Sequence, residues 1–249
     1  MSSQSRETTV LRDGSRVAVV GGGPAGAFFA IHLLRAAKQS NRNIAVTIIE
    51  KESASKPAQA PWRFKGCNYC AGLISPRLLA KMRKIGIRLP HELICKEYTH
   101  VWIHGFWKNF PLKIPSGKKM YSVFRGTLPP DWQDSSGGFD NLILKHATQE
   151  GARVTVGEVQ KIQYTRSEKP LLTVSDYSGA TFTQASDFVA IATGINPRPA
   201  TVDPQSDFYK SYQKTNPRFR PPKVRRTLIF ELKPGSAYLK KYMHKEIYF

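Results

Sequence analysis

The sequence has 249 residues, 41% of them hydrophobic and 22% charged, which is ordinary for a globular protein of one or two domains. Its 38 Lys and Arg residues against 18 Asp and Glu residues give a formal net charge of +20, a field that favours anionic partners. No apolar run reaches the roughly 18 residues that a membrane-spanning helix needs, and residues 1–15 lack the apolar core of a signal peptide. Three cysteines, an odd number, argue against a secreted disulfide framework. We therefore expect a cytoplasmic protein.

The first predicted elements are a strand, a helix and a second strand. Residues 1–15 are expected to be disordered, and a β-branched strand over 16–20 ends at three glycines. A helix is predicted from Pro24 to about Lys38, and the strand over 43–50 closes with an acidic residue. This order predicts a parallel strand pair joined by a right-handed crossover, and hence an α/β fold.

The later elements alternate between helices and strands. Helices are predicted over 75–84, after a capping serine, and over 138–150, before a glycine that ends the helix. Strands are predicted over 98–103, 112–114 and 121–124, then within 152–165, in a Ser-Gly hairpin over 170–183, and as a buried strand within 186–194.

The glycines between the first strand and the first helix form the pattern G-x-G-x-x-G. Gly21 would allow the tight turn, Gly23 would let a pyrophosphate approach the backbone, and Gly26 would let the helix pack closely on the strand. Glu50 ends the second strand, where a carboxylate that accepts hydrogen bonds from ribose hydroxyls belongs. The pattern predicts an adenine dinucleotide site; the alternative is a glycine-rich turn followed by a coincidental acid.

Several segments carry a family resemblance. The start of the chain resembles the FAD-binding start of flavoprotein oxidoreductases and monooxygenases, with "VAVVGGGPAGAFFAIHLL" followed by "VTIIEK". Three later segments resemble the geranylgeranyl reductase branch, which is related to the aromatic hydroxylases: "CAGLISPRLL", "FDNLILKHATQEGARV" and "DFVAIATGINP". The resemblance covers about residues 15–200. It implies a Rossmann-like FAD-binding domain with a parallel sheet and a β-meander insertion, plus the start of a mixed-sheet substrate domain.

The resemblance also implies which residues contact FAD. It places the pyrophosphate on the glycine turn and helix start, the adenosine ribose at the end of the second strand, the adenine near a later valine, and the closing segment at "ATG". The arginine of "YSVFRG" matches one that reaches the cofactor, at a longer spacing than usual from the "FD" helix. The cofactor-binding residues are thus Gly21, Gly22, Gly23, Pro24, Ala25, Gly26, Glu50, Lys51, Arg125, Val159, Ala192, Thr193 and Gly194.

A C-x-x-C pair, Cys67 and Cys70, leaves several interpretations open. A metal site would need more ligands than these two and Cys95 supply, and the spacing fits no familiar finger, so we predict no metal. A redox dithiol, or two small residues in a tight loop, are alternatives. By resemblance, the segment matches a cysteine-glycine stretch beside the flavin and the substrate double bond. It makes Cys67, Cys70 and Gly72 the candidate catalytic residues.

The predicted domain organisation is a disordered start, an FAD-binding domain over 16–200 and an incomplete substrate or C-terminal segment over 201–249. Part of the substrate sheet would be inserted around 96–125. The Gly-Asp flavin motif of these families is not found after Gly194. We therefore expect a C-terminally truncated chain, one that works with a partner subunit, or one that has lost part of its flavin site.

The expected function is that of an FAD-dependent oxidoreductase that reduces carbon–carbon double bonds of an isoprenoid or another hydrophobic or lipid substrate, with NAD(P)H or another reductant as electron donor. The alternatives are a flavin monooxygenase or halogenase acting on an aromatic substrate, and a non-catalytic nucleotide-binding fragment. The basic stretch "HGFWKNFPLKIP" has interleaved aromatics and suits peripheral contact with an anionic membrane. Nucleic acid is not expected as a partner, because no recognised binding motif is present.

Overall fold

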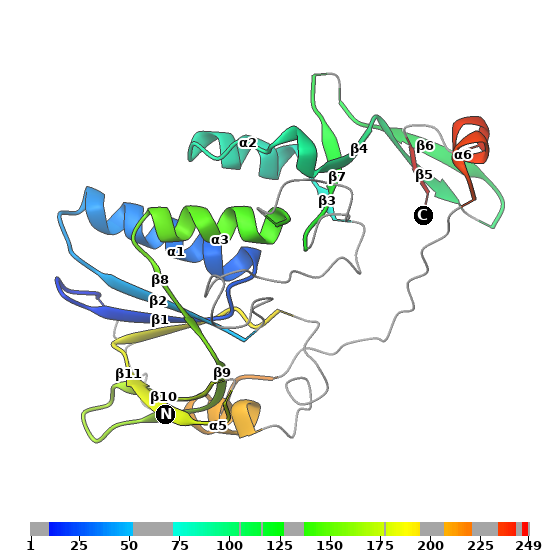
Figure 1. Cartoon of the computed structure of the whole chain (residues 1–249). Coiled ribbons are helices and arrows are strands. Elements are labelled where there is room, and N and C mark those ends of the chain that lie inside the picture. Colours follow the sequence, from blue (N-terminus) through cyan, green and yellow to red (C-terminus); the bar gives the residue numbers. More distant parts are fainter. Residues whose placement is uncertain are drawn as a thin grey trace, which may run out of the picture. The chain divides into compact units, whose positions relative to one another are not determined.

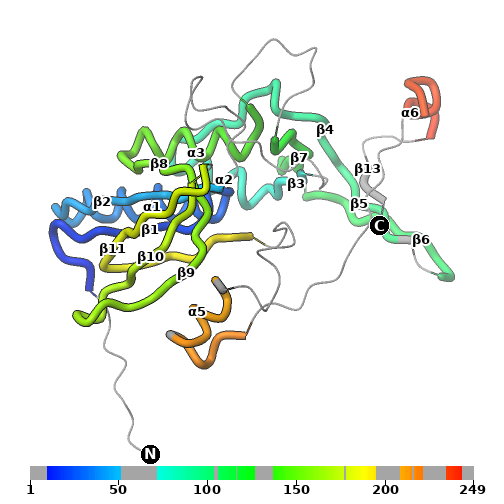
Figure 2. The backbone as a smooth tube through the Cα atoms, turned by 60° about the horizontal axis from the view of Figure 1, so that its bottom comes forward, coloured from blue at the N-terminus to red at the C-terminus, as the bar shows by residue number. Residues whose placement is uncertain are grey.

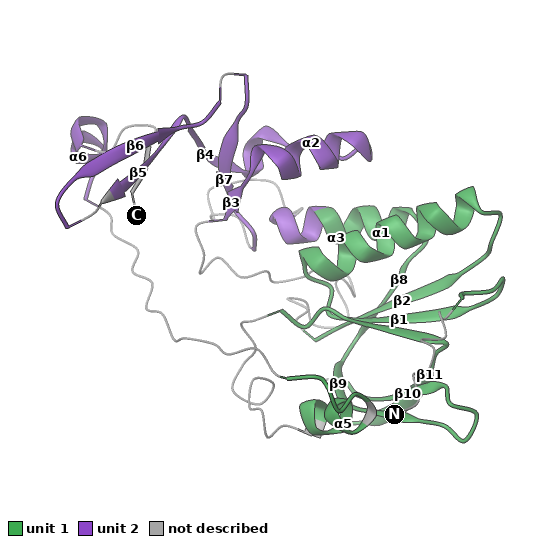
Figure 3. Cartoon of the chain, turned by 180° about the vertical axis from the view of Figure 1, so that it is seen from behind, with its two compact units in different colours: residues 1–63, 143–224 green, residues 64–142, 225–249 purple. Residues whose placement is uncertain are grey.

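The computed structural model describes residues 10–51, 72–126 without 105 and 116, 137–194 without 177, 207–220, 234–242 and 246–248 (Figure 1). The chain divides into two compact units, residues 1–63 with 143–224 and residues 64–142 with 225–249 (Figure 3). The domain boundaries expected after residues 15 and 200 stay predictions of functional organisation. None of the described helices is long and apolar enough to cross a membrane.

A four-stranded parallel sheet organises the first unit. Its strands lie in the order β12-β1-β2-β8, and every neighbouring pair is parallel. The bounds are Arg16–Val20 for β1, Ala45–Glu50 for β2, Arg153–Val156 for β8 and Phe188–Ile191 for β12. Helix α1, Pro24–Gln39, connects β1 to β2. The predicted α/β fold with a parallel strand pair is confirmed.

One strand differs from the prediction. The strand expected within 186–194 to be buried is β12, whose first residue Phe188 is 37% exposed and whose other residues are half-buried. The physical reason is its position at the sheet edge, where it pairs with β1 alone. Its apolar composition is typical of a central strand, and composition alone does not reveal an edge.

A three-stranded antiparallel sheet forms a second layer of this unit, in the order β11-β10-β9 (Figure 2). Its strands are Glu158–Tyr164 (β9), Pro170–Ser175 (β10) and Thr181–Ala185 (β11). The predicted Ser-Gly hairpin between β10 and β11 is confirmed, with Gly179 at φ +83°. Helix α5, Asp207–Thr215, packs on β9 and was not predicted.

One core cluster of the first unit lies between these two sheets. Buried side chains from the parallel sheet meet buried side chains from β9, β10 and α5: Ala18, Val20, Ile49, Val159, Ile162, Leu172, Val174, Phe208 and Tyr209. Figure 1 shows α1 on one face of the parallel sheet and the β9–β11 sheet toward the other. Burial on both faces explains why β1 after Arg16, and β2 apart from Thr47 and Glu50, are apolar rather than alternating.

The second unit contains two small sheets. The first has the order β3-β7-β4, with Leu73–Ile74 (β3), Ile94–Tyr98 (β4) and Met120–Val123 (β7). The second has the order β13-β5-β6, with His100–His104 (β5), Asn109–Lys113 (β6) and Glu246–Tyr248 (β13). The helical elements are α2 (Pro76–Lys84), η1 (His91–Leu93), the start of α3 (Phe139–Gln149) and α6 (Ser236–Tyr242).

Two predictions about this unit have clear outcomes. The helix expected over 75–84 is confirmed as α2, with the Ser75 hydroxyl accepting a hydrogen bond from the Leu78 N–H at 3.2 Å. The single strand expected over 98–103 is wrong, because the chain bends at Thr99 and forms two strands. β4 pairs with β7 whereas β5 pairs with β6, so the bend moves the chain from one sheet to the other.

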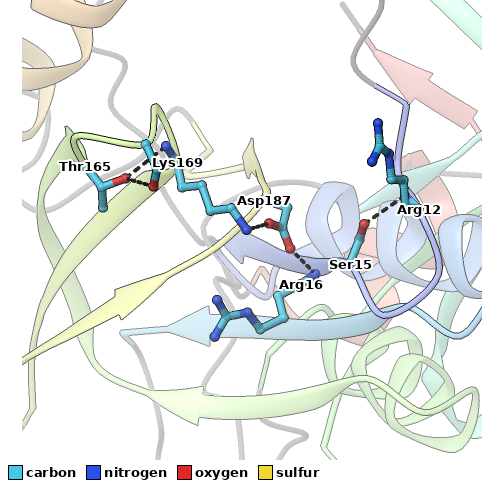
Figure 4. Close-up of polar contacts among 7 residues, drawn as sticks. Arg12, Ser15, Arg16, Thr165, Lys169 and Asp187 are labelled. Atoms are coloured by element: carbon cyan, nitrogen blue, oxygen red, sulfur yellow. Dashed lines mark hydrogen bonds and ion pairs between the residues drawn. The ribbon is translucent and has the colours of Figure 1, made fainter.

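Asp187 ties the start of β12 to the rest of the first unit (Figure 4). Its carboxylate accepts a hydrogen bond from the Arg16 N–H at 2.7 Å and lies 2.7 Å from the Lys169 ammonium. Its own N–H donates to the Arg16 carbonyl at 2.7 Å. The Arg16 N–H, followed by Lys169, holds the pKa of Asp187 below its usual value.

We predict that Asp187→Asn lowers the free energy of unfolding by about 0.5–1 kcal/mol at neutral pH, because a charge-assisted bond becomes a neutral one and the site is partly solvated. A lowered pKa in the folded state means that this stability is present above the unfolded-state pKa and is lost as pH falls through the folded-state pKa. Denaturant unfolding of both proteins should therefore converge below about pH 3. Lys169→Met removes the ion pair alone and should cost less; equal losses at acid and neutral pH would contradict this assignment.

Candidate dinucleotide-binding site

The turn between β1 and α1 is held between two neighbouring strand ends. Gly21 has φ +107°, and its N–H donates to the Ile49 carbonyl of β2 at 2.8 Å. On the other side, the Ala192 N–H donates to the Val20 carbonyl at 2.8 Å. A Cβ at Gly21 would lie 2.4 Å from the Ala192 oxygen, so the backbones approach too closely for any side chain. The structure thus brings the "ATG" segment against the glycine turn.

Gly26 lets α1 pack directly on β1. A Cβ there would lie 2.0 Å from the Gly21 carbonyl oxygen and 3.0 Å from Val19 Cγ1. This is the close helix–strand packing predicted for the third glycine of the pattern. The contact fixes where the first turn of α1 begins relative to the end of β1.

Gly23 differs from the other two glycines of the pattern. It is the N-cap of α1, at φ −64° and ψ 179°, and a Cβ built on it would meet nothing within 4 Å. No described side chain caps this helix, and Pro24 occupies its first position. The first N–H groups of a helix lack intrahelical partners, and the helix dipole places positive charge there. The space beside Gly23 therefore fits an anionic group such as a pyrophosphate.

Glu50 lies beside this turn at the end of β2. Its side chain is 7% exposed, and its Oε2 accepts a hydrogen bond from the Gly22 N–H at 2.5 Å. A Cβ at Gly22 would lie 3.0 Å from the same oxygen, which explains a glycine at this position. The Glu50 carbonyl accepts a hydrogen bond from Gly157 at 2.9 Å, so main chain and side chain are both fixed. A carboxylate has about four acceptor positions, so it can serve the Gly22 N–H and ribose hydroxyls together.

Four further residues of the first unit were predicted to contact the cofactor. Lys51 Nζ lies 3.7 Å from Glu158, and the Val159 side chain belongs to the buried core. Thr193 and Gly194 follow Ala192 directly, with Gly194 at φ +72°. Ligand contacts of these four residues stay predictions.

Arg125 belongs to the second unit and forms a bidentate pair there. Its Nε donates to Asp140 Oδ1 at 2.9 Å, and its Nη2 donates to Oδ2 at 2.7 Å. The Asp140 side chain is 2% exposed, and burial raises its pKa although Arg125 acts in the opposite direction. Sequence reasoning missed this pairing, and its signal is the acidic residue of the "FD" helix start. A cofactor contact of Arg125 stays a prediction.

The candidate catalytic residues are only partly described. Cys67 and Cys70 lie outside the described residues. Gly72 has φ +59°, and a Cβ there would lie 2.1 Å from the Val123 oxygen, so the approach of β3 to β7 already requires a glycine. Among the described residues, no three His, Cys, Asp or Glu side chains gather as metal ligands.

Comparisons with known proteins agree with this geometry. Residues 18–74, which include the glycine turn and Glu50, match a family model described as FAD-NAD(P)-binding. The flavin-dependent brominase Bmp2 is 19% identical with a TM-score of 0.50, over 73% of this chain and 38% of that one. The chain has the fold of an FAD-binding domain. No curated protein matches it.

Two further solved structures are similar to this chain. A flavoprotein/dehydrogenase from Cytophaga hutchinsonii is 17% identical with a TM-score of 0.46, over 72% of this chain and 39% of that chain. CabE, an aromatic hydroxylase from angucycline biosynthesis, is 17% identical with a TM-score of 0.46, over 80% of this chain and 33% of that one. This chain therefore spans well under half the length of each of these proteins.

Replacing Gly26 or Gly23 by alanine should change the free energy of unfolding by different amounts. Gly26→Ala should lower the free energy of unfolding by about 1–3 kcal/mol, because its Cβ overlaps the Gly21 carbonyl. Gly23→Ala should leave it within about 0.5 kcal/mol, since the site is open and a weaker N-cap is offset by a less flexible unfolded chain. Denaturant unfolding without added nucleotide measures both, and equal losses would contradict the contact at Gly26.

Without Arg125, the buried Asp140 carboxylate should destabilise the folded state. Arg125→Ala should destabilise the protein by about 3 kcal/mol at neutral pH, because a buried carboxylate loses its partner. Without Arg125 the pKa of Asp140 rises further, so the folded state takes up a proton more readily and its stability falls more steeply as pH rises. Unfolding curves between about pH 4 and pH 8 test this. The double variant Arg125→Ala/Asp140→Asn should lose the extra slope; parallel curves for wild type and Arg125→Ala would contradict the pairing.

Proposed function

We propose that this chain is the FAD-binding part of a flavin-dependent oxidoreductase, with the FAD pyrophosphate at the turn between β1 and α1. The observation that carries the proposal is the arrangement of Gly23 and Glu50. At the start of α1, Gly23 has no side chain, no described side chain caps the helix, and a Cβ there would meet nothing within 4 Å. The buried Glu50 carboxylate lies next to this helix start and accepts a hydrogen bond from the Gly22 N–H. The family match over residues 18–74 supports the same assignment.

In this proposal the chain's own groups bind and orient the cofactor. The N–H groups at the start of α1 and the helix dipole stabilise the pyrophosphate. Glu50 accepts hydrogen bonds from both hydroxyls of the adenosine ribose, and its negative charge disfavours a ribose that carries a 2′-phosphate. FAD supplies the redox chemistry when bound, and NAD(P)H or another reductant would supply electrons.

Two classes of substrate follow from the predictions, and we put the halogenase or monooxygenase class first. The similarity of the fold to that of a flavin-dependent brominase supports this order. The second class is reduction of a carbon–carbon double bond in an isoprenoid. Product analysis with a phenol and bromide, against an isoprenoid alkene, distinguishes the two. A non-catalytic nucleotide-binding role is the remaining alternative.

FAD binding is the direct test of this proposal. Titrating the purified chain with FAD should quench the flavin fluorescence, and ADP-ribose should compete, because it carries the adenosine and pyrophosphate without the flavin. Glu50→Gln should weaken binding about ten- to hundredfold, as expected for a lost hydrogen bond to a charged group.

A matched control keeps the test specific. Glu97→Gln neutralises a carboxylate of the second unit, which pairs with Lys119 at 3.2 Å, and should bind FAD like the wild type. Equal FAD affinities for the wild type and Glu50→Gln, or no competition by ADP-ribose, would contradict the proposed site.

A further inference from the structure

The hairpin formed by β5 and β6 in the second unit exposes large aromatic side chains at its loop. Phe106 is 103% exposed and Trp107 is 95% exposed, and Lys108 follows them directly. Figures 2 and 3 show this loop at the end of the hairpin away from the β3-β7-β4 sheet of the same unit. Exposed aromatics of this size, side by side, are unusual on a soluble surface and mark an interaction site.

The strand register continues this apolar character along one face of the hairpin. Val101 lies opposite Leu112, and Ile103 lies opposite Phe110. Because side chains two apart in a strand share a face, these four residues form a single apolar face. Leu112 and Phe110 are exposed, so a large part of this face meets solvent.

The charged side chains of the hairpin itself and of the turn that follows it are all cationic. Lys108, Lys113 and Lys118 are exposed, and none of them forms an ion pair with a carboxylate in the described part of the chain. Between Glu97 and Asp131 the sequence contains no acidic residue. The hairpin therefore combines an apolar loop and face with cationic side chains, and the acidic residues on the elements beside it are Glu97, which pairs with Lys119, and Glu246 of β13, which is in register with His100.

We propose that this hairpin docks the protein on an anionic lipid bilayer, independently of the function proposed above. Phe106 and Trp107 would enter the interface between headgroups and acyl chains, where aromatic side chains are favoured. Lysines near an anionic surface contribute about a fivefold gain in affinity each. The bilayer satisfies both features at once, the apolar one and the cationic one.

Two other occupants fit the hairpin less well. A second copy of this chain carries the same net charge of +20, so self-association would bring like charges together. Single-stranded nucleic acid would stack on the aromatic rings, but bases offer little to the aliphatic residues Val101, Ile103 and Leu112. Acyl chains bury aromatic and aliphatic side chains alike.

Vesicle sedimentation of the whole chain tests the proposal. Vesicles of phosphatidylcholine with about a third phosphatidylglycerol, in about 0.1 M salt, should bind it, whereas phosphatidylcholine alone should not. Phe106→Ser/Trp107→Ser and Lys108→Glu/Lys113→Glu should each weaken binding about tenfold or more. Tyr164→Ser and Lys161→Glu, which change exposed residues of β9 in the first unit, are matched controls and should bind like the wild type.

A spectroscopic readout keeps the test valid if a variant misfolds. Lipids brominated near the headgroup should quench part of the tryptophan fluorescence, and Trp107→Phe should reduce that quenching while binding persists, with Trp102 of β5 as the other hairpin tryptophan. Hairpin variants that are folded and bind like the wild type would overturn the proposal, as would quenching that is unchanged in Trp107→Phe. Hairpin-dependent binding of a single-stranded oligonucleotide without vesicle binding would also overturn it.

Discussion

The close approach of α1 to β1 at Gly26 is the contact on which the rest of the site depends. With no side chain between the Gly26 Cα and the Gly21 carbonyl, the helix begins directly at the strand end. That places the helix start, with its unpaired N–H groups and positive dipole end, at the carboxyl edge of the parallel sheet. Any larger residue would move the helix, and the turn that Gly21 makes against Ala192 would have to move with it.

Electrostatics then divide this region into two complementary parts. The start of α1 attracts negative charge. Glu50, which lies beside it in space at the end of β2, supplies negative charge and is fixed by the Gly22 N–H. A ligand that fits both parts needs an anionic group linked to a group that carries hydroxyls. A nucleoside diphosphate has both. The chain-wide charge of +20 favours such a ligand at long range but does not place it. The same excess of cations gives the β5–β6 hairpin, whose own charged side chains are lysines, its separate character.

More of the first unit than of the second could be predicted from the sequence, and the reason is physical. The β1-α1-β2 segment and its glycines are specified locally, by strand composition, helix periodicity and backbone turns, so their positions could be predicted. The pairing of Arg125 with Asp140 joins residues 15 apart on two different elements, with the acidic residue of the "FD" helix start as its one sequence signal, and the contact of Gly72 with Val123 joins segments far apart in the chain. Likewise the bend at Thr99 follows from which sheet each strand joins, and the exposure of β12 follows from its place at an edge. No local pattern predicts the Gly72 contact, the bend at Thr99 or the edge position of β12.

Hydrogen exchange of the backbone amides tests most directly whether the first unit holds a dinucleotide at the glycine turn. The amides of Gly23, Ala25 and Gly26 at the start of α1 should gain protection when FAD is added, because the pyrophosphate accepts hydrogen bonds there, whereas the Gly21 and Gly22 N–H groups already donate to Ile49 and Glu50. FMN, which lacks the adenosine and the second phosphate, should protect them far less. Equal protection by FMN and FAD, or no change in this segment at saturating FAD, would contradict the account.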